Sequence, residues 1–131
     1  MLDANKTNPD TANRDIVRLD QNHRRSRAVI AGGVVYLAGQ VADDKSGDIR
    51  SQTREALAKV DALLTEAGTD KSRALTAQIW LADMADYDGL NAVWDEWVVP
   101  GHTPTRCCGK VELADPAFRV EIVITAALPQ S

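Results

Sequence analysis

The chain has 131 residues, 44% of them hydrophobic, which is enough for one hydrophobic core and too little for two ordinary domains. Fifteen Lys and Arg against nineteen Asp and Glu give a net charge of -4, which disfavours a general binder of nucleic acid or of anionic membranes. The sequence shows neither a signal peptide nor a run of about 18 apolar residues, so we expect a cytoplasmic protein.

The beginning of the chain is predicted to hold a polar arm and three strands. Residues 1–14 bury too little apolar surface to offset the entropy of ordering, so we expect a loose arm there and one domain over residues 15–131. Short apolar runs predict strands over residues 16–19, 27–31 and 34–38. Gly32 and Gly33 are expected to join the last two of these in a tight hairpin.

Two amphipathic helices follow in the prediction. The first is expected to begin after an N-cap at Asp48 and to end at Gly68, and the second to begin after Asp86 and to end at Pro100-Gly101. Their apolar stripes contain Ile49, Thr53, Leu57, Val60 and Leu64 in the first helix, and Leu90, Val93, Trp94, Trp97 and Val98 in the second.

Three further strands complete the predicted order βββαβαββ. Residues 75–81 alternate between apolar and polar side chains and lie between the helices, while residues 105–111 and 118–124 form the last two strands. The fold class is therefore α/β in the α+β sense, a single domain with a mixed sheet and two helices on one face.

The early strands also carry information on assembly. Residues 28–31 and 34–38 are continuously apolar, as strands covered on both faces are, although two helices cover only one face. A second copy of the same sheet is the economical cover for the other face. The alternative is a monomer in which loops fold across a central strand pair.

Metal and thiol chemistry have little support in the sequence. His23 and His102 stand alone, without Cys or carboxylates at metal-ligand spacing, and so few histidines also disfavour a Ser-His-Asp or Cys-His arrangement. Cys107 and Cys108 are adjacent, so in a strand they point to opposite faces and cannot form an ordinary disulfide. We expect reduced thiols and no metal site.

Arg106 and Glu121 are the polar residues of interest in the last third of the chain. Arg106 enters a strand just after a proline, and Glu121 lies on the face opposite Val120 and Ile122. A guanidinium suits a bound carboxylate, and a carboxylate can accept a proton or orient water. The alternative from spacing alone is that the two residues pair across neighbouring strands or face solvent.

Several sequence blocks, spread over residues 16–128, resemble the RidA/YjgF family and most closely its short YoaB-like members. They are Ser26-Arg27-Ala28-Val29, Val35-Tyr36-Leu37-Ala38-Gly39-Gln40, Asn91-Ala92-Val93-Trp94-Asp95-Glu96-Trp97, Pro104-Thr105-Arg106-Cys107-Cys108 and Val120-Glu121-Ile122. Each block alone is weak, but their order and spacing together are specific. The resemblance implies a chorismate-mutase-like fold that forms a homotrimer with ligand clefts between subunits.

The resemblance also implies roles for individual residues. Arg106 would hold a substrate carboxylate and Glu121 would position or activate water, so these two are the candidate catalytic residues. The pocket would further be lined by Gly39, Asn91 and Cys108, with Cys108 as a pocket residue and not a nucleophile.

Two positions depart from the family pattern and affect the expected substrate range. Ala38 stands where many members have serine, and Arg25 falls about where many have a tyrosine over the ligand. Arg25 is therefore a candidate binding residue for a second anionic group, or else part of a solvated basic rim with Arg24 and Arg27.

The resemblance favours hydrolysis of a 2-imino or 2-enamino acid to the keto acid and ammonia. No cofactor is expected, because a protonated imine carbon is already electrophilic, and no nucleic-acid or membrane partner is expected. The alternative is a non-catalytic module that binds a keto acid in the same cleft and reports it to a partner. A nuclease or translation inhibitor is disfavoured by the acidic charge and by the absence of aromatic-basic patches.

Overall fold

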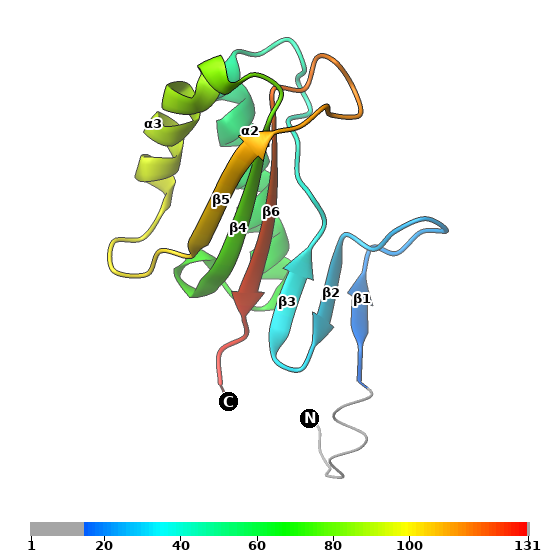
Figure 1. The fold of residues 1–131 in the computed structure, drawn as a ribbon. Helices are drawn as coiled ribbons and strands as arrows, with labels where there is room; N and C mark the ends of the chain where they lie inside the picture. Colours follow the sequence, from blue (N-terminus) through cyan, green and yellow to red (C-terminus); the bar gives the residue numbers. More distant parts are fainter. Residues whose placement is uncertain (1–14, 131) are drawn as a thin grey trace.

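The computed structural model describes residues 15–130, so the expected polar arm lies outside the described residues (Figure 1). Its strands are β1 (Val17–Leu19), β2 (Ala28–Ala31), β3 (Val34–Leu37), β4 (Ala74–Leu81), β5 (Thr105–Lys110) and β6 (Val120–Ala127). Its helices are α2 (Ile49–Ala67) and α3 (Tyr87–Trp97), and two short 3-10 turns, η1 (Lys71–Arg73) and η2 (Met84–Asp86), precede β4 and α3. The predicted order βββαβαββ is confirmed.

The six strands form one mixed sheet in the order β1-β2-β3-β6-β4-β5. Only β4 and β5 run parallel, and helix α3 supplies the crossover connection that a parallel pair requires. The hairpin between β2 and β3 is confirmed, since Gly32 and Gly33 have φ angles of 57° and 79°, which the tight primed turns require. The last strand in the sequence, β6, lies in the middle of the sheet, between β3 and β4.

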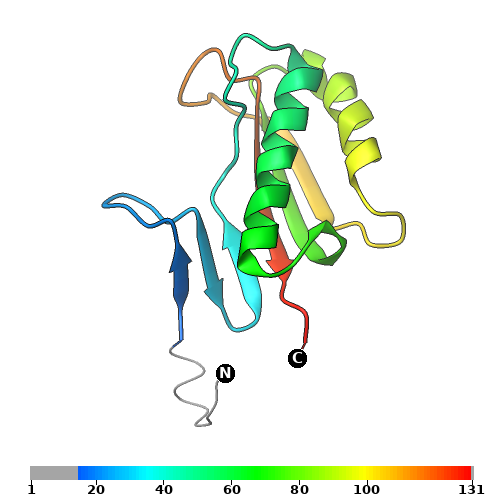
Figure 2. The same cartoon turned by 180° about the vertical axis from the view of Figure 1, so that it is seen from behind.

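Both helices pack on the same face of the sheet, as the two opposite views show (Figures 1 and 2). Helix α2 begins at the predicted N-cap, because the Asp48 side chain accepts a hydrogen bond from the N–H of Ser51. It ends at the predicted Gly68, whose φ of 92° places it in the left-handed region. The sequence therefore encodes both ends of this helix locally.

The core lies between the helices and the alternate residues of the central strands. Every second residue of β6 is fully buried, and these residues face the buried stripe of α2. The largest fully buried apolar side chains are Val35, Leu57, Val60, Leu64, Ile79, Leu81, Leu90, Val120, Ile122 and Ile124. This alternation fixes the direction of the remaining residues of β6, Glu121 among them, because successive residues of a strand point to opposite faces.

Two predicted boundaries and one predicted helix cap are wrong in detail. Helix α3 ends at Trp97, before Pro100-Gly101, since Val98 already has an extended conformation. Asp86 occupies the N-cap position but makes no side-chain capping bond, because its carboxylate binds Arg119. The last strand begins at Val120 and not at residue 118, and it continues to Ala127.

The second face of the sheet, which we call the open face, carries no helix in the described part of the chain (Figures 1 and 2). Tyr36 of β3 is 49% exposed there, and Trp80, Val123 and Thr125 share this face by the alternation of β4 and β6. An uncovered sheet face with aromatic and aliphatic side chains is typical of an assembly surface. Neither helix in residues 15–130 is long and apolar enough to span a membrane.

Candidate functional site

Arg106 lies at the edge of the sheet, on strand β5, and its side chain turns toward helix α3. Its Nη2 donates a hydrogen bond of 3.3 Å to the hydroxyl of Tyr87. The guanidinium carbon lies 5.8 Å from the centre of the Tyr87 ring and 5.5 Å from that of Trp94, within the range of cation-π attraction. Two aromatic rings thus hold the charge without neutralising it, and the N–H groups that do not bond to Tyr87 stay free for an anion.

Cys108 shares a face of β5 with Arg106, while Cys107 is exposed on the other face, as predicted from strand alternation. Both are free cysteines. Burial raises the pKa of the Cys108 thiol, and the positive charge of Arg106 only opposes this effect. A protonated thiol suits a residue that lines a pocket, and it is a poor nucleophile.

Glu121 lies on the open face, beside Gly39. A Cβ built on Gly39 would overlap the Glu121 carboxylate at Oε2, so glycine leaves room for this side chain in its present position. The chain after β3 is fixed here by Gln40, whose backbone N–H and carbonyl both bond to Ile122 at 2.9 and 3.0 Å. The structure therefore brings Gly39 and Glu121 together, with the Glu121 carboxylate lying against the backbone of Gly39.

Within one chain, Arg106 and Glu121 do not meet. Strand β4 lies between β5 and β6, and the register pairs Arg106 with the buried Ala77 but Glu121 with Trp80. Since Ala77 and Trp80 point to opposite faces of β4, the two charged residues do so as well. Their expected alternative role, as a pair across neighbouring strands, is wrong.

The other two candidate residues also separate. Asn91 lies on α3, four residues after Tyr87 and three before Trp94, which places it on the helix face that meets Arg106. Arg25 is exposed in the loop between β1 and β2, at the opposite edge of the sheet, where its Nη1 bonds to the carbonyl of Asp20 at 3.1 Å. The six candidates thus form one set on the β5-α3 edge (Arg106, Cys108, Asn91) and one set away from it (Glu121, Gly39, Arg25).

An ion pair between Asp86, which is buried, and Arg119, whose side chain stays 45% exposed, connects the elements that carry the two sets. Asp86, directly before α3, is 8% exposed and accepts hydrogen bonds of 3.0 and 3.1 Å from both ends of the Arg119 guanidinium. These contacts raise the pKa of Arg119, through the hydrogen bonds first and the charge of Asp86 second. Arg119 precedes Glu121 by two residues and Asp86 precedes Tyr87 by one, so the pair ties the start of β6 to the start of α3.

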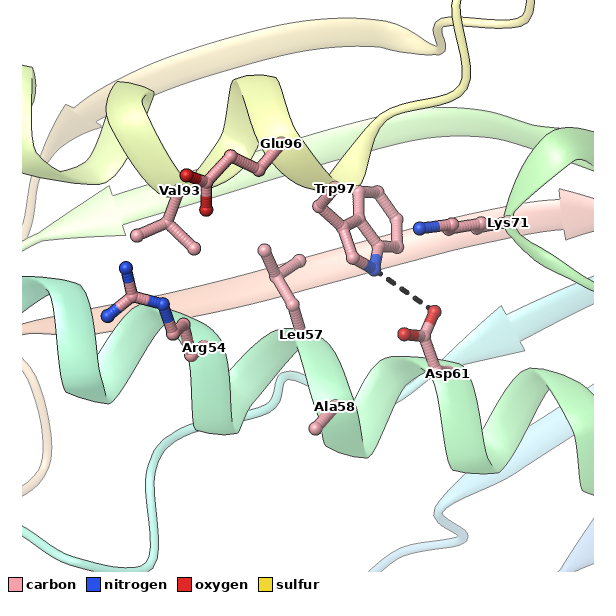
Figure 3. Close-up of a pocket in the computed structure, with 8 residues that line it drawn as sticks. All are labelled: Arg54, Leu57, Ala58, Asp61, Lys71, Val93, Glu96 and Trp97. Atoms are coloured by element: carbon pink, nitrogen blue, oxygen red, sulfur yellow. Dashed lines mark hydrogen bonds between the residues drawn. The ribbon is translucent and has the colours of Figure 1, made fainter.

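A separate groove of about 250 Å³ lies between α2 and α3, on the outer surface of the helical layer (Figure 3). The Trp97 ring forms part of its wall, and its Nε1 donates a 3.0 Å hydrogen bond to Asp61. The Lys71 ammonium lies 5.4 Å from the centre of the Trp97 ring. These contacts join the helices. Trp97 also packs on Trp94, with 5.2 Å between ring centres, and so supports the two rings of Tyr87 and Trp94 that hold Arg106, which we call the aromatic cradle.

Tyr87 and the Asp86–Arg119 pair were not predicted from the sequence. Tyr87 precedes the predicted apolar stripe, but its spacing of four and seven residues from Asn91 and Trp94 places all three on one helix face. That spacing is a usable signal. The ion pair joins residues 33 apart, and nothing in the local sequence indicates it.

Comparisons with known proteins give consistent results along nearly the whole chain. The family model described as Endoribonuclease L-PSP matches residues 16–128. A RutC family protein of Haemophilus ducreyi is 47% identical over 113 residues, which cover 86% of this chain and 97% of the relative. The RutC family protein YoaB of Escherichia coli is 42% identical over 113 residues, with 86% and 98% coverage.

Solved structures agree with the sequence comparisons. An uncharacterized protein of Pseudomonas aeruginosa superposes with a TM-score of 0.86 at 46% identity, covering 88% of this chain and all of the other. NMB1025 of Neisseria meningitidis, described as a member of the YjgF protein family, gives a TM-score of 0.87 at 42% identity, covering 91% of this chain and 99% of the other. The expected chorismate-mutase-like α+β fold is confirmed.

Proposed function

The chain belongs to the YjgF/RutC family, and from this premise we propose that it is a metal-free hydrolytic deaminase. Its substrates would be 2-imino or 2-enamino acids, or a related small carboxylate enamine, and its products the keto acid and ammonia. No cofactor would take part, and the reaction would run in the cytoplasm.

The observation that carries this proposal is the cradle of Arg106. The guanidinium is held by two aromatic rings and one weak hydrogen bond, and no carboxylate of residues 15–130 forms a salt bridge with it. A planar cation without a counter-ion, fixed in direction, is suited to bind a carboxylate through two parallel hydrogen bonds. This is the group that every 2-imino acid presents.

We further propose that the site is shared between copies in a homotrimer. The β5-α3 edge supplies Arg106, Cys108 and Asn91, and the open face of a neighbouring copy supplies Glu121 and Gly39. An edge that docks on a face is a heterologous contact, which cannot form a two-fold dimer and closes into a ring of three when the rotation between copies is a third of a turn. The separation of Arg106 and Glu121 within one chain supports this arrangement, because one small substrate cannot reach both.

In the proposed reaction, Arg106 orients the substrate carboxylate and Glu121 accepts a proton from a water molecule. The water oxygen adds to the imine carbon and the proton passes to the nitrogen, which gives a carbinolamine. Transfer of the carbinolamine hydroxyl proton to the nitrogen, with cleavage of the C–N bond, then releases ammonia and leaves the keto acid. Because imines also decay in water, orientation and one acid-base group are sufficient to provide several factors of ten in rate. Cys108, protonated through burial, would line the pocket without attacking the substrate.

The description of the family model names a ribonuclease, but this chain offers little for that chemistry. Its net charge is -4, and its two histidines lie apart, one in the exposed loop after β1 and one between α3 and β5. RNA binding depends on basic surfaces that neutralise phosphates. The Arg106 guanidinium between Tyr87 and Trp94 therefore supports a reaction on a small carboxylate better than one on RNA.

The proposed function is tested by ammonia release from fresh imines. An amino-acid oxidase generates 2-imino acids from a panel of amino acids, and their decay is followed with and without the protein. We expect faster decay for at least one aliphatic imine. Binding of pyruvate or 2-ketobutyrate without faster decay would identify a keto-acid binding module and contradict the deaminase.

Two substitutions test the roles of the charged residues. Arg106→Lys keeps the charge but loses the fork, and loss of a buried charged contact costs about 2 to 5 kcal/mol, so kcat/KM should fall at least about tenfold. Glu121→Gln keeps the shape but removes the base, so turnover should fall while pyruvate still binds. Arg54→Lys and Glu96→Gln, the same changes in the groove between the helices, are matched controls that should have no effect.

Mixing the two variants tests whether the site is shared. Each inactive variant carries one intact half, so random reassembly of Arg106→Lys chains with Glu121→Gln chains should restore about a quarter of the sites. Recovery of activity on mixing supports a shared site. If the mixed sample stays as inactive as its components while the chains demonstrably exchange, both residues act within one chain, against the separation described above.

A further inference from the structure

Tyr87 is the more exposed of the two aromatic rings beside Arg106, and it carries a polar hydroxyl. Trp94, the second ring of the cradle, is only 5% exposed, whereas Tyr87 is 39% exposed. Trp94 therefore forms the floor beneath the guanidinium. Tyr87 forms a wall whose hydroxyl reaches the surface where an anion would approach.

The hydroxyl of Tyr87 retains its own hydrogen. Arginine can only donate, so in the bond between Arg106 Nη2 and Tyr87 the hydroxyl oxygen is the acceptor. Within residues 15–130 this is the one hydrogen bond that the Tyr87 hydroxyl makes. At 3.3 Å it is also longer than the usual 2.9 to 3.0 Å, so it is weak and readily adjusted. A free O–H donor thus stands beside the guanidinium donors.

The backbone of Tyr87 is firmly held. Its N–H bonds to the carbonyl of Met84, and the preceding residue, Asp86, is clamped by Arg119 through two hydrogen bonds. A tyrosine side chain has only two rotatable angles, and its ring here packs against the Arg106 guanidinium. Ordering this hydroxyl on a ligand therefore costs little entropy.

We propose that Tyr87 is a specificity residue that donates its hydroxyl hydrogen to the carboxylate held by Arg106. A carboxylate offers about four acceptor positions, so two bonds from the guanidinium leave places for a third donor. The third bond favours a charged carboxylate over a neutral amide of the same shape, because hydrogen bonds with an ionised partner are the stronger ones. This inference rests on the proposed function, since that function places a carboxylate at Arg106.

Binding of a charged and a neutral ligand to Tyr87→Phe tests the inference. The variant keeps the ring and the cation-π contact and loses only the hydroxyl, so the fold and the cradle should persist. We expect the Kd for pyruvate to rise about tenfold and the Kd for pyruvamide to stay unchanged. In the imine assay the KM should rise with kcat nearly constant, as for a contact made equally in ground and transition states.

A double-mutant cycle with Arg106→Lys supplies a second readout. If both side chains bind the same carboxylate, their effects on pyruvate affinity are not additive. Equal loss of pyruvate and pyruvamide binding in Tyr87→Phe would show a merely structural hydroxyl and overturn the inference. Unchanged binding of pyruvate, or failure of the parent chain to bind it, would overturn it too. Pyruvate binding that depends on Tyr87 without imine hydrolysis by the parent would overturn the proposed function alone.

Discussion

The β5-α3 edge and the open face hold charged side chains of opposite sign in different ways. At the edge, a cation is held by π-faces and a hydroxyl, so its direction is fixed while its charge stays available. On the open face, the Glu121 carboxylate occupies the space that the missing side chain of Gly39 leaves open. In the proposed shared site, each half would meet the complementary half of a neighbouring copy.

If the proposed site is shared between copies, this difference explains how a small domain can build a site without a deep cavity of its own. A polar residue on a bare sheet face is exposed until something covers it, and a cation at a sheet edge stays hydrated until something docks there. Association would cover both at once and exclude water between them. The largest predicted effects therefore come from changes that prevent association.

Val123→Asp attacks the open face without touching either proposed catalytic residue. Val123 shares that face with Trp80 and Glu121, and an added carboxylate there would be buried unpaired on assembly. We expect sedimentation at micromolar concentration to change from about three chains to one, with loss of imine hydrolysis. A parent protein that sediments as a monomer would contradict the shared site.

Gly39→Ala sharpens the comparison, because it alters one half only. The new methyl group overlaps the Glu121 carboxylate and must displace it, so turnover should fall about tenfold or more while pyruvate binding at Arg106 persists. Gly109→Ala is the matched control on the same face. There the added Cβ would lie 3.4 Å from the Trp80 ring, an ordinary contact, and full activity is expected.

Asp61→Asn tests the hydrogen bond that holds Trp97 behind Trp94 and Arg106. Burial raises the pKa of Asp61, against the Trp97 hydrogen bond and the charge of Lys71, so the folded chain takes up this proton before the unfolded chain as the pH falls. The ionised carboxylate therefore opposes folding above its folded pKa. Asparagine keeps an acceptor for Trp97, and because Asp61 is partly solvated, unfolding in urea at pH 7 should show a gain below about 1 kcal/mol. A gain that persists below the unfolded pKa of about 3.8 would refute the electrostatic cause.

Removal of divalent metals should have the smallest effect, on either half. Among residues 15–130 no three His, Cys, Asp or Glu side chains lie close enough to hold a metal ion. Dialysis against EDTA should leave imine hydrolysis and pyruvate binding unchanged. Loss of activity in EDTA that zinc restores would require a different mechanism.

Much of the fold follows from local sequence signals. Asp48 and Gly68 delimit α2, Gly32-Gly33 makes the hairpin, and alternation in β6 separates the core residues from Glu121. Such features depend on backbone conformation and on period-two or period-3.6 patterns, which a sequence states directly. The ion pair between Asp86 and Arg119 has no such local signal in the sequence. The prediction that the Asp86 side chain caps the helix was therefore wrong.

The sequence by itself determined the elements, their order and the chemical groups of the candidate site, a guanidinium at Arg106 and a carboxylate at Glu121. Only the tertiary structure decided that β4 separates these residues and that they face opposite sides of the sheet. It also decided that Tyr87 and Trp94 surround Arg106. Strand order and cross-element contacts depend on which residues far apart in the chain pack together, and short-range spacing carries no record of that choice.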